Sequence, residues 1–294
     1  NMSSEGGNIT IQGKANVTAT TDSSLSAISS NKGAVAIKDA TVTATSTNTG
    51  TAITAGGNIT ISGTANVTAV TPANCNAATI GSPSGTVEIT DATVTATSNG
   101  PGAAIGSSYG GAGPNIVFGG NCNITATNTL SGGAIGCGNA SSGGTVVING
   151  GTINSKATGG TPCIGGDNTK ITINGGTINT YSVGGAGIGA SYSGLSTTAN
   201  IIFKGGVLLS QSEGSSPADL CTIHGKIDFS PTIPVKITAS DNTDGSNPVT
   251  NDYTLSGQPH YKYVKVESYS SLKYSVQPQN STVLQGSTAN FSAQ

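Results

Sequence analysis

The chain repeats one short phrase at a nearly constant interval. The segment GGNITISGTANVTAV (56–70) almost repeats GGNITIQGKANVTAT (6–20), and GTVEITDATVTATS (85–98) almost repeats GAVAIKDATVTATS (33–46). Each unit opens with two apolar residues separated by one position, and successive pairs follow every 24 to 30 residues. Such self-similarity indicates a solenoid, in which each unit buries its apolar side against its neighbours. The pairs are Ile9/Ile11, Val35/Ile37, Ile59/Ile61, Val87/Ile89, Ile116/Phe118, Val146/Ile148, Ile171/Ile173, Ile201/Phe203 and Ile227/Phe229.

Within a unit the apolar residues recur at every second position. Ile9 and Ile11 alternate with polar neighbours, and after a Gly-containing turn Val17 and Ala19 do the same. This period is that of a β-strand with one buried face, and no window has the spacing of an amphipathic helix. Three strands per unit predict an all-β fold, a right-handed parallel β-helix of about nine coils in which isoleucines stack. The third apolar position falls at Ile28, Ile53, Ile80, Ile105, Ile135, Ile164 and Ile188.

The composition agrees with a narrow β-helix. Only 8% of the residues are charged and 4% are aromatic, whereas glycine occurs 44 times. Aliphatic ladders fill such an interior, and glycine serves corners where φ is positive. The formal net charge of −2 provides no basic surface for nucleic acid or an anionic membrane. No apolar stretch approaches the roughly 18 residues of a membrane-spanning helix, so we expect no membrane insertion by this chain.

The five cysteines predict neither a disulfide framework nor a metal site. Cys122 and Cys163 occupy positions that hold alanine in other units, so we interpret them as small buried hydrophobes. No CxxC pair suggests zinc. Asp241, Asp244 and Asp252 share one turn-rich stretch but lack the spacing of a calcium-binding EF-hand loop, which favours solvated loop carboxylates. We therefore expect no metal and no cofactor.

The repeat pattern fades after about residue 230, and the chain divides into three segments. Residues 1–225 are predicted to form the parallel β-helix. Residues 226–269 are predicted to form a C-terminal cap, because the last coil of a solenoid otherwise exposes unpaired strand edges and apolar core. Two strand-like phrases lie within it, VKITA (235–239) and YKYVKVES (261–268). Residues 270–294 follow a different pattern, that of a linker or of the start of a further domain.

Several phrases carry a family resemblance. INGGTIN (148–154 and 173–179) and GGAGIGA (184–190) resemble the repeat regions of large cell-surface proteins of anaerobic gut bacteria. YKYVKVE (261–267) is similar to the segment that ends such regions, and the tail (270–294) resembles the opening strands of a bacterial immunoglobulin-like domain. The resemblance implies an adhesive or carbohydrate-binding module of an exported surface protein, secreted or held at the bacterial cell surface. It implies no particular binding residues.

An enzyme is one alternative, because parallel β-helices host polysaccharide lyases and glycoside hydrolases. All eleven basic residues are lysines. The chain therefore lacks the arginine that a resemblance to many β-helical pectate lyases would imply. Asp39 and Asp91 occupy the same turn two coils apart, roughly 10 Å from one another. We interpret them as carboxylates that hydrogen-bond their own turns. His224 and His260 have no evident partner for nucleophilic chemistry, so we predict no catalytic residue.

Threonines mark the outward side of the second strand. Thr18 and Thr20 point outward if Val17 and Ala19 point inward. Such rows resemble ice-binding faces, but threonine also favours strands and forms stabilising ladders on one face of a sheet, and we prefer this structural interpretation. The corresponding pairs in later units are Thr43/Thr45, Thr68/Val70, Thr95/Thr97, Thr125/Thr127, Asn154/Lys156 and Asn179/Tyr181.

Tyrosines on a polar surface are the candidate ligand-binding residues. Tyr109 and Tyr192 lie in matching loops after the third strand, and Tyr181 points outward from a second strand. Tyrosine rings pack on the C–H faces of sugars while Asn and Asp bind the hydroxyl groups. Asp167 and Asn168 occupy the related turn between the two loops, so the predicted site comprises all five residues. The alternative is that the tyrosines cover a corner of the helix or pack on a neighbouring loop.

Three functions are consistent with the sequence. We predict a non-catalytic, adhesive or carbohydrate-binding module of the cell surface, monomeric, with a polysaccharide or host glycan as partner and no nucleic-acid partner. A structural stalk or spacer is the first alternative, and it requires no ligand. A polysaccharide lyase or glycoside hydrolase is the second, and it requires a groove in which two carboxylates, or a carboxylate and a lysine, meet.

Overall fold

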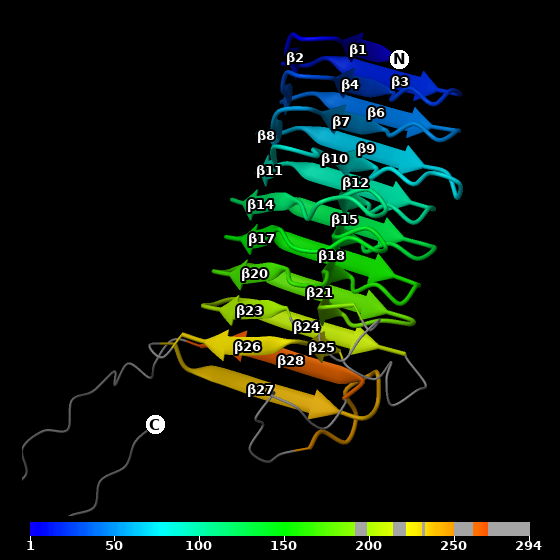
Figure 1. Cartoon of the computed structure of the whole chain (residues 1–294). Helices are drawn as coiled ribbons and strands as arrows, with labels where there is room; N and C mark the ends of the chain where they lie inside the picture. Colours follow the sequence, from blue (N-terminus) through cyan, green and yellow to red (C-terminus); the bar gives the residue numbers. More distant parts are fainter. Residues whose placement is uncertain (192–198, 214–221, 231–232, 250–260, 270–294) are drawn as a thin grey trace, which may run out of the picture.

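The computed structural model describes residues 1–191, 199–213, 222–230, 233–249 and 261–269. Within these residues the chain forms strands and no helix, and it winds through three sheets, named A, B and C here (Figure 1). Strands of successive coils pair in parallel, one rung above the next. The predicted all-β, parallel β-helix architecture is confirmed.

Sheet A collects the third strand of each unit. Its strands are short, because in most units the isoleucine is followed by a glycine at which the backbone turns away. In stacking order the strands are β1 (Met2–Ser4), β4 (Ile28–Ser30), β7 (Ile53–Ala55), β10 (Ile80–Gly81), β13 (Ile105–Gly106), β16 (Ile135–Gly136), β19 (Ile164–Gly165), β22 (Ile188–Gly189) and β25 (Ile223–His224).

Sheet B contains the apolar pairs that open each unit. Within the described residues it has nine strands, and all nine pairs of the sequence fall in it with both members facing inward. Its strands are β2 (Ile9–Gln12), β5 (Val35–Lys38), β8 (Ile59–Ser62), β11 (Thr86–Thr90), β14 (Asn115–Gly119), β17 (Thr145–Ile148), β20 (Lys170–Ile173), β23 (Asn200–Phe203) and β26 (Lys226–Phe229).

Sheet C is built from the second strand of each unit and has the longest strands in the stack. Eight of them pair in parallel, and two antiparallel strands extend the sheet at its C-terminal end. The parallel strands are β3 (Asn16–Thr21), β6 (Thr41–Ser46), β9 (Asn66–Thr71), β12 (Thr93–Ser98), β15 (Asn123–Asn128), β18 (Thr152–Ala157), β21 (Thr177–Ser182) and β24 (Val207–Ser212), and the antiparallel ones are β28 (Tyr263–Ser268) and β27 (Val235–Ser240).

The core consists of aliphatic ladders that run along the stack. In sheet A, Ile80 pairs with Ile53 on one side and with Ile105 on the other, and all three are fully buried. The predicted stacking of isoleucine on isoleucine is thereby confirmed. Cys122 and Cys163 are also buried, as expected for residues that replace alanine. Burying an aliphatic side chain contributes about 1.5–3 kcal/mol, so the ladders dominate the stability of the stack.

A glycine ladder borders the core in sheet A. At Gly136, where φ is +114°, a β-carbon would lie 2.4 Å from the carbonyl oxygen of Gly165. Gly106 has φ of +148°, and its β-carbon would lie 1.9 Å from the carbonyl oxygen of Gly136. No side chain fits there, and φ in this region is essentially restricted to glycine. The glycine of the repeated Ile-Gly dipeptide is therefore required by a close backbone contact between coils.

A row of buried polar side chains lies at the ends of the strands of sheet C, a feature that the alternating pattern of the sequence does not predict. Ser98 Oγ donates a hydrogen bond to the carbonyl of Gly102 at 2.8 Å. In the next coil Asn128 Nδ2 donates to the same carbonyl at 2.8 Å, and its Oδ1 accepts a bond from the Leu130 amide at 2.9 Å. These side chains hydrogen-bond the backbone groups of the turn in place of water. Buried backbone groups need such partners, because water does not reach them.

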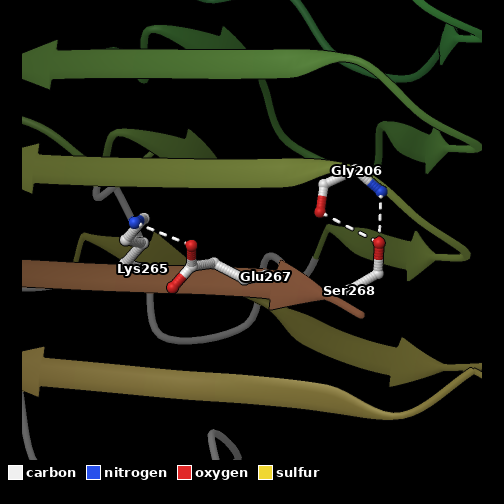
Figure 2. A network of polar contacts seen from close by, with 4 residues as sticks. All are labelled: Gly206, Lys265, Glu267 and Ser268. Carbon is white, nitrogen blue, oxygen red and sulfur yellow. Dashed lines mark hydrogen bonds and ion pairs between the residues drawn. The ribbon is translucent and has the colours of Figure 1, made fainter. Parts of the chain in front are cut away.

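The C-terminal end of sheet C is covered by the antiparallel pair. β28 pairs with β24, and β27 pairs with β28 on the outside (Figure 1). Val264 and Val266 point into the core. Ser268 Oγ accepts a hydrogen bond from the Gly206 amide at 2.8 Å and donates one to its carbonyl at 3.2 Å, which ties the cap to the start of β24 (Figure 2). On the outer side Lys265 forms an ion pair of 2.8 Å with Glu267 (Figure 2).

The structure bears on parts of the predicted segment boundaries. Parallel pairing continues into β26, inside the segment predicted as the cap. Both strand-like phrases of that segment form strands, β27 and β28. Residues 270–294, predicted to begin an immunoglobulin-like domain or a linker, lie outside the described residues.

Candidate functional site

Among the described residues, the loops that follow the sheet A strands carry three of the five predicted site residues. Tyr109 lies in the loop after β13, its side chain is 51% exposed, and its amide donates a hydrogen bond to the Asn76 carbonyl at 2.8 Å. Successive loops pair with one another through Ala112, Ser142 and Asp167. The loops therefore form an ordered ridge beside sheet A, with Tyr109 and Asp167 two coils apart along it.

Asp167 and Asn168 shape this ridge. Asp167 Oδ1 accepts a hydrogen bond of 2.8 Å from the amide of Ser191 in the next coil. Asn168 adopts φ of +56°, a left-handed conformation that asparagine tolerates better than most residues, and its side chain is exposed. Tyr192, the remaining predicted residue of these loops, lies outside the described residues.

Tyr181 lies on a different surface, the outer face of sheet C. It stands between Lys156 and Gln211 in the stack. The Lys156 ammonium lies 5.3 Å from the centre of the tyrosine ring, within the range of a cation–π contact. The Tyr181 hydroxyl donates a hydrogen bond to the Glu213 carboxylate. The four predicted residues that the structure describes are thus divided between two surfaces: the loop ridge beside sheet A and the outer face of sheet C.

The outer face of sheet C is an uncharged array of hydroxyl and amide groups over its first five strands. Every outward position of β3, β6, β9, β12 and β15 is Thr or Asn except Val70. Thr95, the middle outward residue of β12, lies within the array, in register with Thr68 and Thr125. Parallel strands in register repeat each group at the strand spacing of about 4.8 Å, so the array is regular as well as neutral.

Beyond β15 the same face changes in character. Asn179 Nδ2 donates a hydrogen bond to Asn154 Oδ1 at 2.9 Å, forming an amide ladder. The adjacent row holds Lys156 and Tyr181. The neutral array therefore leads directly into the region where a cation, an aromatic ring and a carboxylate meet.

Asp39 and Asp91, the carboxylates considered as a catalytic pair, have a structural arrangement that differs from the prediction. Asp39 Oδ1 accepts hydrogen bonds from the amide and the hydroxyl of Thr64, at 2.8 and 3.2 Å. Asp91 Oδ1 accepts one from the Asn121 amide at 2.7 Å. The expectation that they bond their own turns is wrong, because each carboxylate reaches the equivalent turn one coil further on. The Thr64 amide is the main cause of the lowered pKa of Asp39.

Glycine makes this arrangement possible. Both aspartates adopt a left-handed conformation, with φ of +55° at Asp39 and +59° at Asp91. In the following coil Gly63 takes the same position, and a β-carbon there would lie 2.2 Å from Asp39 Oδ1. Gly120 stands in the same relation to Asp91, at 2.1 Å. Aspartate and glycine thus alternate along this corner as linked pairs.

The remaining titratable candidates are dispersed. Within the described ranges no group of three or more His, Cys, Asp and Glu residues is placed to hold a metal ion. His224 Nδ1 lies 3.1 Å from the Ala190 carbonyl oxygen. Asp244 Oδ1 accepts a hydrogen bond from the Ser246 amide at 2.9 Å, within its own loop. Asp252 and His260 lie outside the described residues. No helix long and apolar enough to cross a membrane is found among the residues that were placed.

Comparisons with known proteins leave the fold and these surfaces as the guide to function. The chain matches no protein-family model, no curated protein and no solved structure. The fold itself defines a class, the parallel β-solenoids. Chemically, the two surfaces offer neutral hydrogen-bonding groups and aromatic rings, the groups with which proteins bind carbohydrates.

Proposed function

We propose that this chain is a non-catalytic carbohydrate-binding, adhesive module of a bacterial cell-surface protein. The observation that carries the proposal is the outer face of sheet C, where neutral threonine and asparagine side chains repeat in register over β3 to β15. A polysaccharide chain is itself a repeating array of neutral hydroxyl groups. Its contacts with this face require no desolvation of a charge, which is the costly part of burying polar surface.

Two further features support the proposal. Beyond the neutral array the same face carries Tyr181, beside which a sugar finds hydrogen-bonding groups on Lys156 and Glu213. Repeat phrases of the sequence resemble those of cell-surface proteins of anaerobic gut bacteria, which bears on the proposed location at the bacterial surface. Neither feature identifies the particular polysaccharide.

Affinity electrophoresis tests the proposal. The chain is run in native gels cast with neutral plant and host polysaccharides, and the same mixtures are assayed for new reducing ends. We expect retardation without new reducing ends. Thr95→Lys places an ammonium within the neutral face and should weaken retardation about tenfold, because the charge must be desolvated on contact. New reducing ends would instead support a glycoside hydrolase or lyase.

A matched control separates the face from the fold. Thr60 points outward from β8 on sheet B, away from sheet C, so Thr60→Lys adds the same charge to a different surface. This variant should be retarded like the unaltered chain. Equal losses in the two variants would contradict a role for the sheet C face. Absence of retardation on every polysaccharide would favour the stalk, for which the continuous parallel pairing from β2 to β26 is the supporting observation.

A further inference from the structure

The outer face of sheet B differs in chemistry from that of sheet C. Four successive strands, β14, β17, β20 and β23, follow one another along the stack (Figure 1). Their middle outward positions pair in register and form one row, called the apolar row here, which consists of Val117, Val147, Thr172 and Ile202. All four side chains are half-buried. Single apolar residues on a surface need no explanation, whereas a contiguous strip offers a ligand a place to pack its C–H groups.

Amide groups border the apolar row on both sides. On one side Thr145 Oγ1 donates a hydrogen bond to Asn115 Oδ1 at 2.9 Å. On the other side Asn174 Nδ2 donates one to Asn149 Oδ1 at 2.7 Å. Asn115 and Asn149 accept these bonds through their oxygens, and both side chains are exposed. Their NH2 groups can therefore donate to a ligand that lies on the row.

Three exposed lysines flank the same face toward its C-terminal end. Lys170 begins β20 and Lys226 begins β26 on one side of the apolar row, with Asn200 between them in register. Lys204 directly follows β23 on the opposite side. Lys226 forms an ion pair of 3.0 Å with Asp228, but Lys170 and Lys204 form none with any described residue. The face therefore carries two positive charges that no neighbouring carboxylate pairs.

The spacing of the lysines favours a polymer over a small anion. Lys170 and Lys226 are two strand spacings apart, roughly 10 Å, and Lys204 lies four residues beyond Asn200, roughly 13 Å across the sheet. A single carboxylate or phosphate could contact all three ammonium groups only if the lysines lay flat across the apolar row. A chain that runs along the row passes each lysine in turn and leaves the row free for its own C–H groups.

The number of charges decides which class of polymer fits. Anionic membranes are bound by clusters of roughly 4–8 basic residues, and DNA by proteins that neutralise roughly 6–10 phosphates. Three lysines, one of them paired, fall short of both. A polysaccharide that carries carboxylates among neutral hydroxyl groups has a lower charge density, and its sugar rings can pack on aliphatic side chains such as Val147 and Ile202.

We propose that the outer face of sheet B from β14 to β26 binds a uronate-containing polysaccharide along the stack. Its sugar rings lie on the apolar row, and its carboxylates contact Lys170, Lys204 and Lys226. This inference goes beyond the proposed function, because it concerns another sheet and an acidic rather than a neutral glycan. Because the lysines are exposed, salt should screen their contacts with the carboxylates.

Isothermal titration calorimetry of the full chain tests the proposal. The probes are hyaluronate and polygalacturonate, each compared with its methyl ester, which keeps the sugar chain but removes the negative charge. We expect at least one acidic polymer to bind, and its methyl ester to bind at least about tenfold more weakly. Binding of the acidic form should also weaken when the NaCl concentration is raised from about 0.05 to 0.5 M.

Lysine variants locate the surface. The double variant Lys170→Gln and Lys204→Gln should weaken binding of the acidic polymer about tenfold, because two charged contacts are lost. Lys170→Arg with Lys204→Arg keeps both charges and should retain binding. Lys14→Gln with Lys32→Gln is the matched control, because it removes the same net charge from exposed turns in the first coils. Exposed side chains are replaced in every variant, so all of them should fold normally.

The outcomes distinguish this proposal from the proposed function. The sheet B surface is overturned if neither acidic polymer binds, if the methyl esters bind equally well, or if the variant Lys170→Gln with Lys204→Gln binds fully. Tighter binding of heparin, duplex DNA or phosphatidylserine vesicles would also overturn it. None of these results alters the retardation of the unaltered chain by neutral polysaccharides. Loss of that retardation in Thr95→Lys, with full binding of the acidic polymer, would support two separate surfaces.

Discussion

A single carboxylate can connect two coils of this solenoid, as Asp39 shows. It accepts two hydrogen bonds from Thr64 in the next coil and itself adopts a left-handed conformation. Asparagine tolerates the left-handed conformation and keeps an oxygen that can accept these hydrogen bonds. Alanine is strained in this conformation and has no acceptor. We expect the free energy of unfolding at neutral pH to decrease from Asp39 to Asp39→Asn and further to Asp39→Ala, as measured by urea denaturation.

Lowering the pH should reduce the difference in the free energy of unfolding between the unaltered chain and Asp39→Asn. The pKa of Asp39 is lowered in the folded chain, chiefly by the Thr64 amide. The carboxylate therefore stabilises the fold above its unfolded-state pKa, and this contribution is lost as the pH falls through the lowered value. Asp22→Ala, which truncates an exposed aspartate, is the control. Equal stabilities of Asp39→Ala and Asp22→Ala would refute a role for the bond between coils.

The buried thiol of Cys163 should make the fold sensitive to alkali. Burial raises its pKa from 9.0 to about 12, and its Sγ donates a hydrogen bond to the Tyr181 carbonyl at 3.0 Å. The Cys163 thiol ionises at a lower pH in the unfolded chain than in the folded one. The stabilisation that it contributes is therefore complete below about pH 9, and it decreases as the pH rises toward the folded pKa. Each pKa unit corresponds to about 1.4 kcal/mol, so between about pH 8 and 10.5 the unaltered chain should lose about 2 kcal/mol more than Cys163→Ala.

Denaturation curves of the two proteins over this pH range measure the effect directly. Alanine is a fitting replacement, because Ala104 and Ala134 occupy the equivalent position in other coils. Other groups that titrate in alkali are common to both proteins and cancel in the difference. Parallel pH profiles for the two proteins would show that folding does not raise the pKa of the Cys163 thiol.

At the scale of the strand, the glycines of the sheet A ladder cannot be replaced by larger residues without disturbing the neighbouring coil. Gly136→Ala introduces a β-carbon 2.4 Å from the Gly165 carbonyl oxygen at φ of +114°. We expect a loss of at least about 3 kcal/mol in the free energy of unfolding, from strain and displaced backbone. Gly160→Ala is the matched control, because an added β-carbon meets no atom within 4 Å, and its effect should stay within about 0.5 kcal/mol. Urea denaturation compares them, and similar losses would contradict the ladder.

The strands and their inward faces could be predicted from the sequence for a definite physical reason. A period of two assigns each side chain to one face of a strand, and near-identical phrases can only stack in register. The pairing of Ile53, Ile80 and Ile105 follows directly. Contacts between coils were harder to foresee. The partner of Asp39 lies 25 residues away in sequence, and the local pattern alone cannot show that a side chain reaches the next turn rather than its own.

The candidate site illustrates the same limit. Exposed tyrosines can be suspected from Gly- and Ser-rich surroundings, and Tyr109 does lie in a surface loop. Its separation from Tyr181 depends on which sheet each belongs to. A small hollow beside sheet A is lined in part by Thr51, Ser82 and Ser108, which belong to three successive coils. No sequence window contains them together, so only the stacking of coils brings them to one place.

For the molecule as a whole, stability should vary along the stack. Each coil contacts only its neighbours, so solenoids behave as one-dimensional arrays in which an end opens before the middle. β28 and β27 cover β24 in sheet C, whereas β1, β2 and β3 at one end, and β25 and β26 at the other, each have a single neighbour in the described chain. Hydrogen exchange should therefore be faster in these end strands than in β24, and slowest in the central coils.

A substitution in the cap tests whether the coils are coupled in this way. Val266 is fully buried and paired with both Leu208 and Ile237, so Val266→Asp places an unpaired carboxylate in the core. We expect faster exchange in β24 and β21, a smaller change in the central coils and no change in β3 to β9. Lys265→Ala, which removes only a surface ion pair worth at most about 1 kcal/mol, should leave the profile almost unchanged. A uniform increase from β3 to β24 would instead mean that the solenoid opens as one cooperative unit, with the cap controlling the stability of every coil.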